Sequence, residues 1–160
     1  MSAKGTIVTN FVGAQSTAAS TTDTNCEIIG TTTRLLRVVR CFIGQSTHKT
    51  SEQVAMKLER HTGTGTGTAY TPMLKEPNAG AAGYSAKIND TVEPTYAGLA
   101  TSVIFQKPAN SLTGRDFVIP PGQEIYVAPS ATNGVGLAVT TPAGTTAANY
   151  VNEIEIEEIG

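Results

Sequence analysis

The sequence has no tryptophan, only two cysteines, and charged residues at just 15% of its 160 positions. Two cysteines, Cys26 and Cys41, cannot build the disulfide framework of a small secreted domain, so we expect both to be reduced and Cys41 to be buried. No run approaches the roughly 20 apolar residues of a membrane-spanning helix, and the first residues do not follow the pattern of a secretory signal. These absences predict a soluble, unexported protein with no membrane partner.

An excess of positive charge is missing as well. The chain has 11 basic and 13 acidic residues, for a formal net charge of −2, whereas a protein that neutralises a phosphate backbone needs a basic surface. We therefore expect no nucleic-acid partner. The charges are unevenly distributed, because residues 1–75 carry a net +4 and residues 76–160 a net −6.

The sequence patterns that accompany catalysis or cofactor binding are also lacking. His48 and His61 do not stand in a zinc-binding spacing, and no serine has the Gly-x-Ser-x-Gly setting of a hydrolase. The Thr-Gly repeat of residues 62–68 lacks the Lys-Ser/Thr ending of a phosphate loop and runs into Pro72, so we interpret it as a flexible or bulged connection between strands. We expect no enzymatic activity, no metal and no cofactor.

Threonine is abundant, at 25 positions, together with 16 glycines and 8 prolines. Threonine and valine are restricted at χ1 and pack well on a pleated surface, while glycine and proline favour turns between short strands. Lysine and glutamate, which favour helices, are scarce. This composition predicts an all-β protein.

Periodicity and turn residues place the expected strands. The segment Pro120-Pro121-Gly122-Gln123 fits a type II turn and predicts a hairpin between its flanking strands. Residues 72–98 are expected to form a long surface excursion with brief extended pieces. A helix is the alternative for residues 31–43, and Thr50 with Gln53 leaves a short capped helix open. In all, strands are expected at residues 31–43, 51–60, 99–106, 116–119, 124–128, 135–140 and 150–158.

Two of these strands have informative faces. Strict alternation gives residues 31–43 two partly apolar faces, one for the core and one for a neighbouring subunit. The first face would carry Leu36, Val38, Arg40 and Phe42, and the second Leu35, Arg37, Val39, Cys41 and Ile43. Residues 150–158 instead predict one buried and one polar face, since Tyr150, Ile154 and Ile156 alternate with Val151, Glu153, Glu155 and Glu157.

Seven or eight short strands predict a single β-sandwich or barrel over residues 31–160, most naturally a jelly roll. An immunoglobulin-type sandwich is the alternative, although the sequence lacks its tryptophan and its cysteine spacing. Residues 1–30 are small and polar and cannot bury enough apolar area to offset their ordering entropy. We expect them to form an extended N-terminal arm whose only anchors are Ile7, Val8, Phe11 and Val12.

The charge pattern suggests how the first and last strands of the sandwich meet. These strands are neighbours in a jelly roll, which would bring the arginines at one end of the sequence close to the glutamates at the other. Exposed ion pairs contribute only about 0.2–1 kcal/mol each, so their role would be register or choice of partner. The candidate assembly contacts are Phe11, Arg34, Arg37, Arg40, Glu153, Glu155 and Glu157.

Four stretches together resemble the small jelly-roll structural proteins of tailed bacteriophages, and in particular capsid decoration, or cement, proteins. They read Leu-Glu-Arg-His-Thr-Gly-Thr-Gly-Thr at residues 58–66, Phe-Val-Ile-Pro-Pro-Gly-Gln-Glu-Ile-Tyr-Val at 117–127, Gly-Val-Gly-Leu at 134–137 and Ile-Glu-Ile-Glu-Glu at 154–158. The resemblance covers roughly residues 31–160.

The resemblance implies a homotrimer without catalytic residues, assembled in the bacterial cytoplasm and located on the capsid surface of the virion. It would bind the major capsid protein where capsomers meet and clamp the shell. A trimeric fibre-tip or receptor-binding module is the alternative, although such a module should expose aromatic residues. A trimeric jelly-roll enzyme of the dUTPase type is a further alternative, but its nucleotide motifs are absent.

Overall fold

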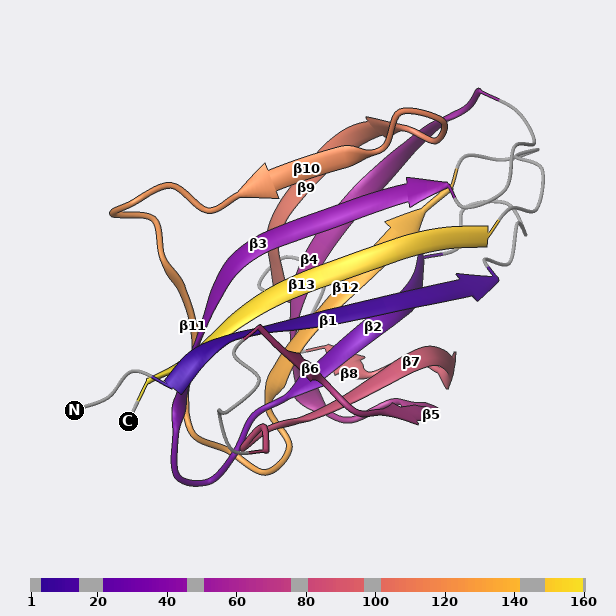
Figure 1. Cartoon of the computed structure of the whole chain (residues 1–160). Coiled ribbons are helices and arrows are strands. Elements are labelled where there is room, and N and C mark those ends of the chain that lie inside the picture. Colours follow the sequence, from indigo (N-terminus) through magenta and orange to yellow (C-terminus); the bar gives the residue numbers. More distant parts are fainter. Residues whose placement is uncertain are drawn as a thin grey trace.

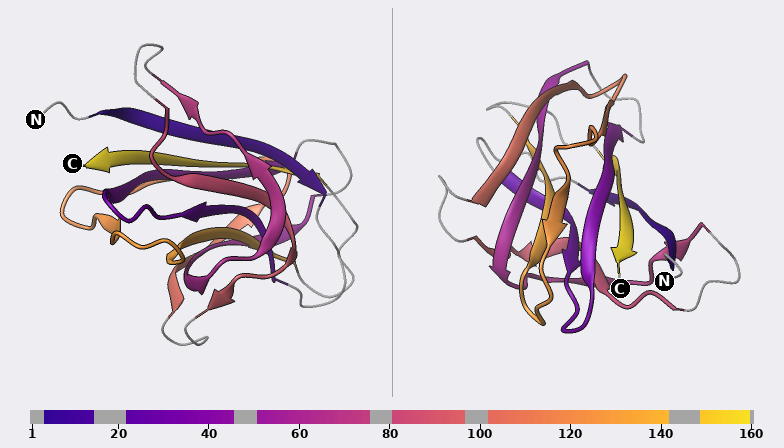
Figure 2. Two further views of the ribbon diagram at one scale, coloured as in Figure 1. Left: turned by 90° about the horizontal axis from the view of Figure 1, so that it is seen from below. Right: turned by 90° about the vertical axis from the view of Figure 1, so that its left-hand side faces the viewer.

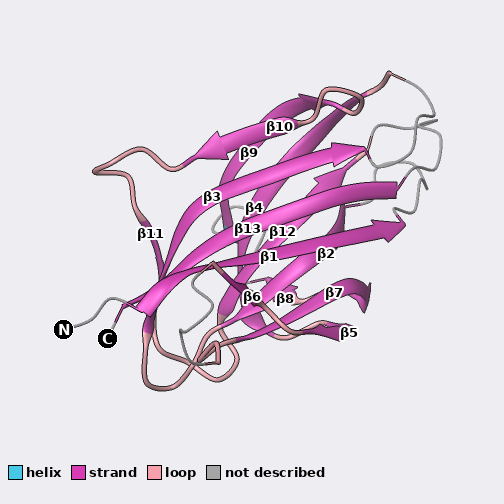
Figure 3. Ribbon diagram, in the orientation of Figure 1, coloured by secondary structure: helices cyan, strands magenta, loops and turns pink. Residues whose placement is uncertain are grey.

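The computed structural model describes residues 4–14, 22–45, 51–75, 81–96, 102–141 and 149–159, and is drawn in Figure 1. Every named element in this part of the chain is a β-strand (Figure 3). The strands form two antiparallel sheets, which we call sheet A and sheet B (Figure 2). A hydrophobic core lies between them. The prediction of an all-β sandwich is therefore confirmed.

Sheet A is centred on the long C-terminal strand β13 (Asn149–Ile159), which has the long strands β3 (Leu35–Gln45) and β1 (Lys4–Ala14) as its two neighbours. Its order is β10 (Arg115–Val118), β3, β13, β1 and β6 (Met73–Leu74), with β11 (Ile125–Val127) also paired to β3. Since β1 and β13 are antiparallel, the start of β1 lies beside the end of β13, as Figure 1 shows.

Sheet B surrounds β12 and is strongly curled. Its order is β5 (Thr66–Tyr70), β7 (Ser85–Val92), β2 (Thr22–Ile29), β12 (Gly134–Thr140), β4 (Gln53–Gly63) and β8 (Thr95–Tyr96), with β9 (Val103–Asn110) also paired to β4. The chain repeatedly crosses between the sheets, from β2 to β3 to β4 and again from β12 to β13. This alternation makes the sandwich jelly-roll-like.

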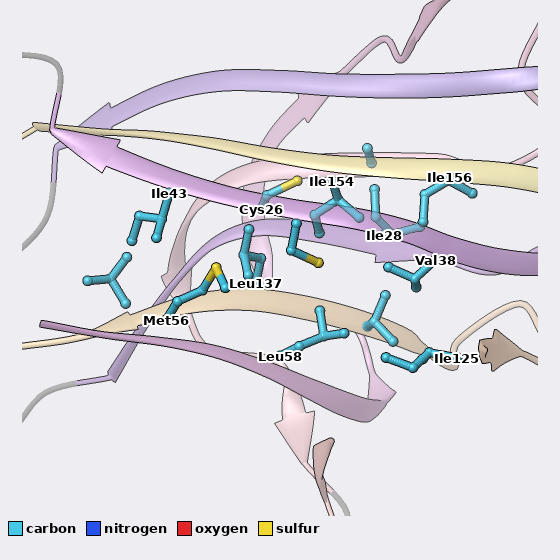
Figure 4. Packing of buried hydrophobic residues seen from close by; sticks show 14 of the residues in the cluster. Cys26, Ile28, Val38, Ile43, Met56, Leu58, Ile125, Leu137, Ile154 and Ile156 are labelled. Carbon is cyan, nitrogen blue, oxygen red and sulfur yellow. The ribbon is translucent and has the colours of Figure 1, made fainter. Parts of the chain in front are cut away.

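The core consists of side chains from the inner faces of both sheets. Residues from β2, β4 and β12 meet residues from β3 and β13 across the sandwich (Figure 4). Cys26 and Cys41 are both unpaired and fully buried, which confirms the expectation for Cys41. The fully buried side chains include Ile28, Leu36, Met56, Leu58, Leu137, Ile154 and Ile156. Burying each such side chain stabilises the fold by roughly 1.5–3 kcal/mol relative to exposure.

A β-bulge in β3 changes which of its residues reach the core. In the register with β13, Glu155 pairs with Arg40 but Ile156 pairs with Val38, so Val39 is the extra residue. Such a residue reverses the alternation of faces beyond it. The buried side chains are accordingly Leu36 and Val38 before the bulge and Cys41 and Ile43 after it. The strictly alternating faces expected for this strand were wrong.

The N-terminal segment differs from the arm expected over residues 1–30. In its described part, β1 lies between β13 and β6 in sheet A, and β2 lies between β7 and β12 in sheet B. Cys26 and Ile28 of β2 are fully buried. Cys26 and Ile28 stand at alternate positions of β2, so a few apolar residues suffice to give this strand a buried face.

The turn after β10 was predicted correctly, but the hairpin around it was not. Gly122 has a positive φ of 84° and Gln123 N donates to Pro120 O at 3.1 Å, as a type II turn requires. However, β10 and β11 both pair antiparallel with β3, one after the other along it, and therefore run in the same direction. Residues 119–124 interrupt one long strand pairing instead of joining two paired strands.

The remaining strands lie close to their expected positions. Residues 53–60, 135–140 and 150–158 are strands, and Val54, Met56 and Leu58 form the buried face of β4 as predicted. The surface excursion contains a regular eight-residue strand, β7, that the sequence indicated only as brief pieces. His48, Thr50 and the start of the strand expected at 99–106 lie outside the described residues.

Candidate assembly face

The candidate site is the outer face of sheet A, away from the core. Because β13 alternates without interruption, Tyr150, Ile154 and Ile156 point inward, as predicted. Glu153, Glu155 and Glu157 consequently lie on the outer side of the strand. We call the outer surface of β10, β11, β3 and β13 the assembly face.

Three cross-strand rows of paired residues make up this face, each running from β10 or β11 through β3 to β13. The strand register gives the rows Asp116–Phe42–Glu153, Val118–Arg40–Glu155 and Tyr126–Arg37–Glu157. Directly opposed residues of antiparallel strands share a face and lie close enough for their side chains to interact. The bulge at Val39 is what places both Arg37 and Arg40 on the outer side.

The charged residues of the assembly face form ion pairs with one another and, in one case, with Lys75, which follows β6. Arg40 donates from Nε to Asp116 Oδ1 at 2.7 Å and from Nη1 to Glu153 Oε1 at 3.0 Å, which links β10 and β13 through β3. The hydrogen bond to Asp116, above all, holds the pKa of the Arg40 guanidinium above its ordinary value. Arg37 forms an ion pair with Glu157, and Lys75 forms one with Glu155. The expected proximity of these arginines and glutamates is confirmed.

Arg34 lies apart from this set. Its guanidinium forms an ion pair with Glu158, which is only 2% exposed and also accepts a hydrogen bond from the Gly83 backbone N–H. Glu158 is on the inner side of β13, because it follows the outward-facing Glu157 in an alternating strand. Arg34 thus closes one end of the sandwich, and the glutamate it contacts was not among those expected.

Apolar side chains lie among these ion pairs. Leu35, Val39 and Phe42 of β3 are half-buried, and the Arg40 guanidinium stands 5.9 Å from the centroid of the Phe42 ring. Three more are exposed: Val118 at 59%, Tyr126 at 39% and Ile159 at 38%. The assembly face therefore combines neutralised charges with accessible apolar area.

Phe11 was expected to be an assembly contact from the arm. Its backbone lies in β1 opposite Asn152 of β13, beside the assembly face in the same sheet. Its role in assembly, like that of the charged residues, stays a prediction.

Sequence reasoning missed a cluster of polar residues buried on the outer side of sheet B. His61, expected beside a loop, is in β4 and 1% exposed, and its Nε2 lies 3.4 Å from Oε1 of the fully buried Glu27. Burial lowers the pKa of this imidazole, so it is neutral near pH 7. Gly134 makes room for it, since a Cβ there would lie 2.5 Å from His61 Nε2. The glycines at alternate positions of β12 were the available signal for this packing.

Within the described ranges, no group of three or more His, Cys, Asp or Glu side chains is arranged to hold a metal ion. The same residues contain no helix that is long and apolar enough to cross a membrane. Comparison of the chain with protein-family models, with curated proteins and with solved structures finds no match.

Proposed function

We propose that the chain is a structural protein that acts by adhesion, as a decoration protein on the outside of a tailed-phage head. The observation that supports this proposal is the assembly face, where paired charges and the exposed Val118, Tyr126 and Ile159 lie on one side of the same sheet. The resemblance of the sequence to jelly-roll cement proteins supplies the proposed partner, the major capsid protein. The proposed role is to clamp neighbouring capsomers at their junctions.

The electrostatics of the face suit close contact with another protein. Burying an unpaired charge at an interface is costly, whereas charges that are already paired can be covered at a lower cost. Arg37, Arg40 and Lys75 are each matched by at least one carboxylate within the same chain. The apolar side chains between them can then provide the favourable contact area.

We further propose that the protein binds as a homotrimer, in which the outer side of β3 meets a neighbouring copy. Such a shared interface would use the half-buried Leu35, Val39 and Phe42. Light scattering at micromolar concentration should then give about three times the 16.6 kDa chain mass. A monomer at all accessible concentrations would contradict the trimer.

The capsid role is tested on phage heads purified from cells that produce the chain. Heads stripped of the protein should release their DNA at a lower temperature than decorated heads, and adding the protein back should restore them. The gain follows mass action and reaches about 2.7 kcal/mol per site when free protein exceeds Kd a hundredfold.

A matched pair of variants connects this effect to the assembly face. Val118→Asp places a charge on the assembly face, where the native side chain is 59% exposed. Val92→Asp places a charge on β7 of sheet B, away from this face, where the native side chain is 61% exposed. If both variants fold, only Val118→Asp should lose occupancy on heads. Equal occupancy would exclude the proposed face. If stripped and decorated heads resist heating equally and the protein instead blocks adsorption to host cells, the fibre-tip alternative is correct.

A further inference from the structure

The Thr-Gly repeat of residues 62–68 continues β4 into β5 and covers part of the buried polar cluster of sheet B. Its threonines are exposed, whereas Gly63 and Gly67 are half-buried and Gly65 is buried. Gly65 is held at both of its backbone polar groups: its N–H donates to Glu27 Oε1 at 3.1 Å, and its carbonyl accepts from Lys87 Nζ at 2.6 Å. The repeat is therefore fastened to β2 and β7 by charged side chains.

Asp90 of β7 lies directly against the two glycines. A Cβ added to Gly65 would lie 2.7 Å from Asp90 Oδ2, and one added to Gly67 would lie 2.1 Å from Oδ1. The same added atoms would lie 2.7 Å from Val92 O and 2.8 Å from Ile88 O, so backbone carbonyl oxygens border the same two spaces as the Asp90 carboxyl group. Both Asp90 oxygens are buried and have no hydrogen-bond partner. An ionised carboxylate, which can only accept hydrogen bonds, is poorly placed among carbonyl oxygens.

The charged groups around Asp90 do not compensate it fully. Glu27 from β2 and Glu93 beyond the end of β7 face it with negative charge, and Lys87 faces it with positive charge. The positive charge of Lys87 is shared with Glu27, because Lys87 Nζ forms an ion pair with Glu27 Oε2 at 3.8 Å. Residues 62–68 contain only threonine and glycine and add no titratable group.

The next described neighbours bring no unpaired positive charge to Asp90, although Glu93 accepts hydrogen bonds from the Thr24 N–H and hydroxyl. His61 in β4 faces Glu27 and is neutral, as described above. Glu59 in β4 and Asp23 in β2 face Glu93, and Lys57 is paired with Glu59 at 2.8 Å. Tyr96 in β8 lies near these carboxylates and is neutral, because burial raises the pKa of its hydroxyl.

We propose that the protonation state of Asp90 controls how tightly the lobe formed by residues 62–70 and β7 packs on sheet B, and we call this arrangement the clasp. When Asp90 is protonated, its O–H donates to one of the surrounding carbonyls and the lobe closes on sheet B. When Asp90 is ionised, the carboxylate is repelled by Glu27, Glu93 and these carbonyls, and the lobe loosens. This inference does not depend on the proposed function.

The direction of the pH response follows from linkage. Burial, with Glu27 and Glu93 adding to it, raises the pKa of Asp90 to about 7 in the closed state, whereas an open, hydrated lobe has the ordinary value near 3.8. The closed state therefore retains a proton that the open state releases. Protonation of Asp90 makes its full contribution to the stability of the closed lobe below the ordinary pKa. This contribution decreases as the pH rises to about 7, and the stability no longer changes with pH above about 8.

Hydrogen exchange of the wild-type protein and of Asp90→Asn tests the clasp between pH 5 and pH 8.5. After correction for intrinsic exchange rates, protection of the amides of β5 and β7 should fall in the wild type by up to about tenfold per pH unit below pH 7. The asparagine side chain of the variant is neutral at every pH and still donates a hydrogen bond, so protection in Asp90→Asn should change little. Asp116→Asn, on the half-exposed Asp116 of sheet A, is the matched control and should keep the wild-type response.

Two results would overturn the inference: wild-type protection of β5 and β7 that does not depend on pH, or the same dependence in Asp90→Asn. If Asp90→Asn does not fold, carbon-13 NMR of the wild-type carboxyl groups decides the question. A titration midpoint within one unit of 7 for Asp90 supports the clasp, and a midpoint near 4 excludes it.

Discussion

Arg40 and Glu153 are 113 positions apart in the sequence, yet Arg40 Nη1 lies 3.0 Å from Glu153 Oε1 on the outer side of sheet A. Arg40 also binds Asp116, so a single side chain links β10, β3 and β13. Arg40→Ala should remove both ion pairs. Because the partners are partly exposed, we expect a loss of about 1 kcal/mol, or roughly 2–4 °C in Tm, in thermal unfolding followed by circular dichroism.

Arg115→Ala is the control for Arg40→Ala, because Arg115 is an exposed arginine one strand away, at the start of β10. Its replacement should change the free energy of unfolding by no more than about 0.5 kcal/mol. An equal loss in both variants would show that general surface charge, and not the bridge between three strands, accounts for the effect.

The pairing of these charges was predictable from the sequence, but the faces of β3 were not. β13 has no bulge facing β1 along residues 149–156, so simple alternation placed Ile154 and Glu153 correctly. In β3 the bulge at Val39 arises from the pairing with β13. A bulge is a property of two strands in register, and the sequence of one strand does not reveal it.

The bulge leads to a direct test with two neighbouring residues. The structure buries Ile43 at 1% exposure and leaves Phe42 half-buried on the outer face. Ile43→Ala should therefore cost about 2–5 kcal/mol in urea unfolding, because it leaves a cavity in the core. Phe42→Ala should cost clearly less, although phenylalanine is larger. The reverse order would mean that β3 alternates regularly and that Phe42 belongs to the core.

Sequence reasoning also treated the first thirty residues as one polar segment. The segment 22–29 supplies Cys26 and Ile28 to the core, and its alternation was hidden by the threonines and other polar residues around it. The buried polar cluster escaped prediction for a related reason. Glu27 and Asp90 are far apart in the sequence, and the pairing of β2 with β7 brings them together.

Removing residues 2–30 should consequently abolish folding. The deletion removes β1 and β2, exposes one edge of β13 and of β12, and opens the core where Cys26 and Ile28 are buried. Loss of cooperative thermal unfolding by circular dichroism is the expected result. Deletion of residues 2 and 3 alone, which precede β1, is the control and should leave the unfolding transition in place. A cooperative transition in the 31–160 fragment would restore the view that residues 1–30 are an accessory arm.

Gly134 of β12 and Gly122 of the turn require glycine for two different physical reasons. At Gly134 the limit is space, because a Cβ would lie 1.9 Å from Ile28 O and 2.5 Å from His61 Nε2. At Gly122 the limit is conformation, because φ is +84° but nothing lies within 4 Å of an added Cβ. Gly122→Ala should therefore cost only about 1–2 kcal/mol in urea unfolding. Gly134→Ala must push apart two central strands and the buried imidazole, which places it among the substitutions that cost more than about 4 kcal/mol. Similar losses in the two variants would mean that β12 and β2 can separate at Gly134 without disturbing His61.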